Sequence, residues 1–152
     1  MAIPVLAAAK RLGERSGWSL SNLEMQKILY LAHMYCLGGR NSALVDGHFE
    51  AWDYGPVHPV LYHRAKIFGK SPVENIFHSV PELGDTEETR LLDQAVDQLA
   101  TAPPGRLVAI THWDGGAWAK HYRPGGRHIV IPNDAIRQEY VDRNLGHNNA
   151  AA

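Results

Sequence analysis

The sequence predicts a mainly α protein, a compact bundle of about six helices with a small two-stranded β element. Apolar residues recur at intervals of three and four along most of the chain, which is the period of helices packed on one face. Only residues 49–54 and 128–131 have the character of strands. Each of these segments is too short to be stable alone, which favours pairing between them.

The first two helices have the clearest boundary signals. Pro4 is typical of an opening turn, and Gly17 ends the helix that follows it. Ser21 and Glu24 have the spacing of a capping box, which predicts the start of a second helix. The glycine pair at 38–39 predicts its end. This second helix is apolar on most sides, so we expect it to be the central one.

The remaining elements follow along the chain, separated by segments rich in proline and glycine. Further helical segments are expected at Pro56–Phe68 directly after the strand at 49–54, from Asp85 with Glu88 to Leu99, over Arg106–His112, around Trp118, and after a cap at Asn133. Residues 146–152 are polar and then plain alanine, which predicts a flexible tail. The chain is therefore expected to form one domain over residues 1–145, followed by this tail.

Composition excludes several classes of protein. The 152 residues suit a single domain with a core of its own. The formal net charge of −1 argues against a dedicated nucleic-acid binder, which carries a basic excess or stripe. No apolar run approaches the ~20 residues of a membrane span, and the N-terminus lacks the basic region of a signal peptide. The single Cys36 cannot form an internal disulfide, so a reducing, cytoplasmic setting is expected.

The chemistry-bearing residues form no catalytic or ligand pattern. None of the nine histidines belongs to a metal signature such as H-E-x-x-H. No serine lies in a Gly-x-Ser-x-Gly elbow, and Asp114-Gly115-Gly116 is a turn without the Gly-Lys-Ser/Thr of a phosphate loop. We therefore expect no catalytic residues, no metal and no cofactor, and a function in binding.

The most informative segment is F-E-A-W-D-Y-G-P-V at residues 49–57. It begins as a strand and breaks at Gly55-Pro56, where we expect the next helix to start. Two interpretations of its aromatic residues remain open. Trp52 and Tyr62 pack this corner against the central helix, or they form a recognition patch together with Tyr54.

Gln26, Lys27 and Tyr30 are the polar residues of the otherwise apolar second helix. Lys27 and Tyr30 lie three residues apart and therefore share a face. Lys27 either extends its ammonium to water beside a half-buried Tyr30, contacts a partner, or clamps the Gly55 corner from inside.

Two blocks together resemble the Panacea-type antitoxin domain, also called GepA-like or SocA-like. L-S-N-L-E-M-Q-K-I-L-Y-L-A at residues 20–32 is similar to the family pattern L-x-x-L-x-L-Q-K-L-L-Y-x-A. Residues 49–57, with Pro59 and Tyr62, are similar to F-x-A-W-x-Y-G-P-V-x-P-x-x-Y. Trp118 after Thr111-His112 resembles the T-H…W element, although Gly116-Ala117 stands where a proline often precedes the tryptophan. The resemblance spans roughly residues 5 to 141.

This resemblance implies an antitoxin that neutralises a cognate protein toxin by direct contact. The SocA-like branch also acts as a proteolytic adaptor that delivers its toxin to the ClpXP protease. Two other classes stay open: a DNA-binding regulator of its own operon, which a gel shift would detect, and a hydrolase. The expected partner-binding residues are Lys27, Tyr30, Trp52, Tyr54, Val57, His58 and Tyr62, and the expected structural residues are Gln26, Gly55, Pro56 and Trp118.

Overall fold

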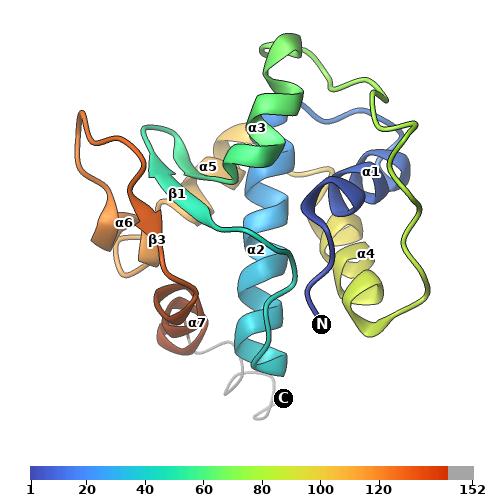
Figure 1. The fold of residues 1–152 in the computed structure, drawn as a ribbon. Coiled ribbons are helices and arrows are strands. Elements are labelled where there is room, and N and C mark those ends of the chain that lie inside the picture. The colour runs from blue at the N-terminus through green and yellow to red at the C-terminus, as the bar shows by residue number, and fades with distance from the viewer. Residues whose placement is uncertain (144–152) are drawn as a thin grey trace.

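A computed structural model describes residues 1–143 and confirms the mainly α prediction (Figure 1). The elements are α1 (Val5–Arg15), α2 (Asn22–Arg40), β1 (Phe49–Trp52), β2 (Gly55–Val57), α3 (Pro59–Ala65), a 3-10 helix η1 (Lys66–Phe68), α4 (Glu87–Leu99), α5 (Pro104–Thr111), α6 (Ala117–His121), β3 (Val130–Ile131) and α7 (Asn133–Asp142). The domain end predicted at residue 145 and the tail predicted over 146–152 lie outside the described residues.

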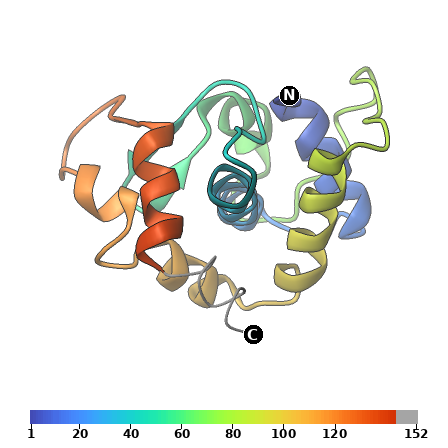
Figure 2. The ribbon, with the colours of Figure 1, turned by 90° about the horizontal axis from the view of Figure 1, so that it is seen from below.

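Helix α2 is the central element, as its composition predicted. Every residue from Met25 to Met34 is buried, which requires neighbours on all sides of the helix. Seen end-on in Figure 2, α2 runs through the middle of the molecule and packs against α4, α5 and α7. The sheet, α6 and α7 lie on one side of α2, and α1 and α4 lie on the other (Figure 1).

The start of α2 was predicted correctly from its capping residues, but its end was not. The predicted capping box is present: Glu24 N donates to Ser21 Oγ at 3.2 Å, and Ser21 N donates to Glu24 Oε1 at 3.0 Å. The predicted end at residues 38–39 is wrong, because the helix continues to Arg40 and ends at Asn41 in the left-handed region (φ 56°). Gly38 has a different role, since a Cβ there would lie 1.9 Å from the Tyr140 ring of α7.

The β element has three strands rather than two, in the order β2-β1-β3. Strand β3 pairs with β1 as expected, with Phe49 opposite Ile131. The helix predicted from Pro56 is wrong at its start, because Gly55–Val57 turns back along β1 as an antiparallel hairpin and α3 begins only at Pro59. Proline is compatible with β2 because β2 is an edge strand, where a missing N–H costs no ladder hydrogen bond.

Three other predicted helix starts are shifted. Thr86, not Asp85, caps α4 by accepting from Thr89 N at 3.2 Å. Helix α5 begins at Pro104, two residues before the expected position. Asn133 is the first residue of α7 rather than its cap, and its side chain is 3.0 Å from His33 Nε2 of α2. Helices α5 and α7 both begin after a proline at the N-cap, which makes no side-chain cap.

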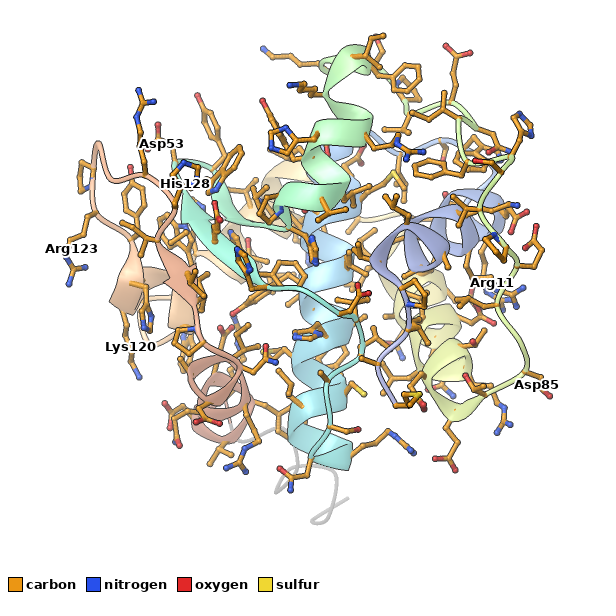
Figure 3. All side chains as sticks on the ribbon, in the orientation of Figure 1. Arg11, Asp53, Asp85, Lys120, Arg123 and His128 are labelled. Carbon is orange, nitrogen blue, oxygen red and sulfur yellow. The ribbon has the colours of Figure 1, made fainter. Side chains whose placement is uncertain are left out.

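Helices α1 and α4 are joined by parallel ion pairs. Arg11 donates twice to Asp93, at 2.9 and 2.8 Å, and Arg15 donates twice to Asp97, at 2.8 and 2.7 Å. The Arg15–Asp97 pair is exposed and contributes at most ~1 kcal/mol, whereas the Arg11–Asp93 pair is partly buried. Arg11 is labelled at this edge of the molecule in Figure 3, on the side of α2 away from the sheet.

Candidate functional site

A groove of about 500 Å³ lies beside the β1–β2 hairpin. It is lined by the first turns of α2, by β1 and the hairpin turn, by Val57 and Tyr62, and by the loop before β3. The full lining is Asn22, Leu23, Gln26, Lys27, Glu50, Trp52, Asp53, Tyr54, Val57, Tyr62, Gly69, Gly126, Arg127 and His128. The two sequence blocks, distant along the chain, therefore meet in one concave surface.

Gln26 joins α2 to the end of the hairpin. Its side-chain oxygen accepts from His58 N at 2.8 Å, and its Nε2 donates to His58 O at 3.3 Å. The amide thus satisfies both backbone groups of one residue, as a neighbouring strand would. Because Gln26 is only 1% exposed, these bonds also remove the cost of burying its own polar atoms.

Lys27 lies inside the molecule at the base of the groove. It is 1% exposed, and its Nζ donates to Pro56 O at 3.1 Å. Burial lowers the pKa of this ammonium to about 7, because the charged form is poorly solvated there. The contact matches a clamp on the Gly55 corner, and the alternative in which the ammonium reaches water is wrong.

Gly55 is required at this corner for two independent reasons. Its φ of +116° is a backbone conformation that side chains disfavour. In addition, a Cβ on residue 55 would lie 2.9 Å from Lys27 Nζ and 3.1 Å from His112 Nε2. The glycine therefore lets the Lys27 ammonium approach the hairpin closely enough to reach Pro56.

Aromatic side chains form one wall and the rim of the groove. Trp52 contacts Tyr62 edge to face, with ring centroids 4.6 Å apart. Trp118 supports this wall from behind, because its Nε1 donates to Trp52 O at 2.7 Å while its ring stacks between His112 and Tyr122. Tyr54 at the hairpin turn is 71% exposed. Trp52 and Tyr62 thus pack the corner, and Tyr54 presents the freely accessible aromatic surface.

Both carboxylates that line the groove are already engaged. Burial alone would raise the pKa of Glu50, but hydrogen bonds from His48 at 2.9 Å and Trp52 at 3.0 Å outweigh it and lower the pKa. Asp53 accepts from Tyr122 OH at 2.5 Å. Figure 3 labels Asp53 and His128 beside each other near the hairpin.

The cations of the groove have no acidic partner. Neither Lys27 nor Arg127 takes part in an ion pair within residues 1–143. His128 lies at the edge of the groove, 3.9 Å from Glu50 and 87% exposed at its side chain. Lys27 and Arg127 are therefore basic groups without an acidic partner, in a groove that Glu50 and Asp53 also line.

Tyr30 and His58 do not line the groove. Tyr30 is fully buried, and its hydroxyl donates to Glu139 Oε1 of α7 at 2.7 Å. His58 is 1% exposed, with Nε2 2.8 Å from Asp46 O. The exposed edge expected for Lys27 and Tyr30 is therefore wrong, because Tyr30 is fully buried and Lys27 is only 1% exposed where it borders the groove.

Glu139 is a residue that the sequence reasoning missed. It is 1% exposed and accepts from Tyr30 OH, from Ala117 N at 3.0 Å and from Arg143 Nε at 2.8 Å. These bonds hold α2, α6 and α7 together behind the groove. The available signal was its position three residues after Ile136, which places a carboxylate on the apolar face of the last helix.

Other kinds of site find no support in the described chain. Within residues 1–143 no three His, Cys, Asp or Glu side chains are placed to hold a metal ion. None of the described helices combines the length and apolar character needed to cross a bilayer. Cys36 is a buried free thiol. Fold and groove thus define a mainly α domain whose distinctive surface is concave and aromatic, with the buried Lys27 amine at its base.

Comparisons with known proteins identify the family. The family model described as antitoxin SocA-like, Panacea domain, matches residues 25–119, which include most of α2 and the whole hairpin. Antitoxin SocA of Caulobacter vibrioides (strain NA1000 / CB15N) is 34% identical over a match of 111 residues, and the match covers 65% of this chain. The match covers 58% of that relative's length. No solved structure matches.

The chain belongs to the SocA-like antitoxin family with a Panacea domain. This confirms the resemblance of its two sequence blocks. Residues 126–128 and α7, which complete the groove and its support, lie beyond the matched range.

Proposed function

We propose that this chain is an antitoxin that neutralises a cognate protein toxin by direct binding, with the groove and its rim as the contact surface. The observation that carries the proposal is that the family match spans residues that build one concave surface, from Lys27 through Trp52 and Tyr54 to Tyr62. Aromatic residues around a desolvated pocket are the usual source of binding energy in protein interfaces. The similarity to a protein named Antitoxin SocA supports the same role.

The segment that borders the groove also exposes apolar side chains. Tyr54 is 71% exposed, Val60 on α3 is 48% exposed, and Ile67 on η1 is 80% exposed. Apolar side chains gathered near a groove mark interaction surfaces in soluble domains. We therefore expect the toxin to cover the hairpin turn and the outer face of α3 as well as the groove.

Co-expression with the product of the neighbouring reading frame tests this proposal. The antitoxin should restore growth, and the two proteins should co-purify. Val60→Ala and Val141→Ala form a matched pair, because both are exposed helical valines and Val141 lies on α7. We expect only Val60→Ala to weaken the complex. Growth rescue without any physical complex would contradict direct neutralisation.

We further propose that the chain acts in the cytoplasm as an adaptor that delivers its bound toxin to ClpXP. The resemblance to the SocA-like branch supports the delivery role, and the buried free thiol of Cys36 suits a reducing compartment. Reconstituted degradation of purified toxin by ClpXP, with and without this chain, is the test. Equal degradation rates would reject delivery and leave simple sequestration.

A further inference from the structure

Lys27 has unused hydrogen-bonding capacity at the base of the groove. An ammonium carries three N–H donors, and the described chain supplies one acceptor, Pro56 O at 3.1 Å. The residue is 1% exposed, so its charge is costly unless an anion compensates it. Arg127, which lines the same groove from the loop before β3, is exposed and also lacks an acidic partner within residues 1–143.

We propose that the groove binds an acidic side chain of the toxin, carried on an extended segment, with its carboxylate between Lys27 and Arg127 and a neighbouring apolar side chain against Trp52 and Tyr62. The inference rests on the proposed function, since it names the part of the toxin that this surface recognises. A volume of about 500 Å³ lies within the ~300–1,000 Å³ of pockets that hold small groups.

The charges of the groove favour a carboxylate over a phosphate. Glu50 and Asp53 also line the groove, where they accept hydrogen bonds from Trp52 and Tyr122. These carboxylates repel any anion and Lys27 and Arg127 attract it, so the cost of taking the anion out of water decides, and that cost is larger for a doubly charged phosphate than for a carboxylate. The net charge of −1 likewise gives no basic stripe for a nucleic-acid backbone.

Binding of a carboxylate here is coupled to proton uptake. With a pKa of about 7, Lys27 is partly neutral at pH 7, and a nearby carboxylate raises the pKa of an amine. Below pH 7 the ammonium is already formed, so binding needs no added proton. Above pH 7 each binding event must take up a proton, so a rise of about one unit in the Lys27 pKa on binding makes the affinity fall about six-fold between pH 6.5 and 8.5.

Other titratable or charged groups surround Lys27. A variant must therefore distinguish the contribution of Lys27 to the pH dependence from the contributions of these neighbours. His112 faces Gly55 from the end of α5; burial and then the Lys27 charge lower the pKa of His112, against a backbone hydrogen bond that raises it. Glu50 and Asp53 face the groove from β1 and its turn, and Arg127 and His128 face it from the loop before β3. Lys27→Met keeps the side-chain length and removes only the amine.

The first arm of the test uses the chain alone. The probe is 3-phenylpropionate, a phenyl ring joined to a carboxylate, and its neutral match is 3-phenylpropanamide. Binding is followed by NMR of protein labelled with ¹³C at lysine. We expect the acid to bind at least ten-fold more tightly than the amide and to raise the titration midpoint of Lys27 by about one pH unit. Equal binding of acid and amide, an unmoved midpoint, or no binding up to the probe's solubility would overturn the proposal.

Two variants and a matched control locate the interaction. Lys27→Met should remove both the preference for the acid and its pH dependence. Arg127→Gln should weaken acid binding several-fold, whereas Arg123→Gln should not, because Arg123 is an exposed arginine of the same loop region that does not line the groove. Figure 3 shows Arg123 on the outer side of that region, away from Asp53 and His128. Equal effects of the two arginine variants would contradict the assigned carboxylate position.

The second arm uses the co-purified complex with the toxin. If a toxin side chain occupies the groove, 3-phenylpropionate should compete with the toxin and Lys27→Met should weaken the complex. A complex insensitive to both would overturn this inference and leave direct neutralisation intact. Failure of any complex to form, with acid binding present in the first arm, would instead reject the toxin as the occupant together with the proposed function.

Discussion

Gly55→Ala should destabilise the protein by about 2–4 kcal/mol. An alanine at φ +116° carries a backbone cost of roughly 1–3 kcal/mol. Its Cβ would lie 2.9 Å from Lys27 Nζ and 3.0 Å from Lys27 Cε, so the ammonium must retreat from Pro56 O. Loss of that hydrogen bond adds roughly 1 kcal/mol. For a chain of 152 residues the total corresponds to a fall in Tm of about 5–15 °C.

Thermal and urea unfolding of five proteins would separate the two contributions: wild type, Gly55→Ala, Lys27→Leu, the double variant and Gly84→Ala. Gly84→Ala is the matched control, because a Cβ there meets no atom within 4 Å, and it should leave Tm nearly unchanged. In a Lys27→Leu background the shorter side chain removes the close contact, so Gly55→Ala should then cost only the backbone strain. The cycle should show about 1 kcal/mol of coupling. An unchanged Tm for Gly55→Ala, or an identical cost in both backgrounds, would refute the reasoning.

Three further changes test the interior and the surface. Glu139→Gln should lower the free energy of unfolding by about 1–3 kcal/mol in urea titrations, because it replaces the buried carboxylate that accepts hydrogen bonds from Tyr30 and from Arg143. An unchanged urea midpoint would exclude a role of Glu139 in holding the helices together. Burial lowers the pKa of His33 to about 4, so the unfolded chain binds its proton first, and stability should fall by about 3 kcal/mol as pH drops from 6.5 towards 4. His33→Gln should flatten that pH profile, and an unchanged slope would assign it to other groups. Tyr54→Ala should weaken toxin binding by about 1–3 kcal/mol in calorimetry with folding intact, and an effect no larger than that of Val141→Ala would show that the surface is misplaced.

The candidate site was predictable only in part. The two sequence blocks identify residues that do meet, since Lys27, Trp52, Tyr54, Val57 and Tyr62 share one groove. Their orientation was not predictable, because the pattern of α2 shows that it is buried but not which groups cover each side. Arg127 and Glu139 were missed because they come from distant parts of the chain and reach the site only through the packing of the β3 loop and of α7.

What the sequence determined by itself is local in origin. The capping box at Ser21 depends on atoms three residues apart, and the central place of α2 follows from apolar residues on nearly all of its sides. The tertiary structure decided the roles of Gly38 and Gly55. Gly38 gives room to Tyr140, and Gly55 belongs to a hairpin that is defined by pairing with β1 and by the approach of Lys27. A glycine in the sequence indicates only that a side chain is disfavoured at that position. Whether the reason is a turn, a helix end or a distant neighbour depends on contacts that form only when the chain folds.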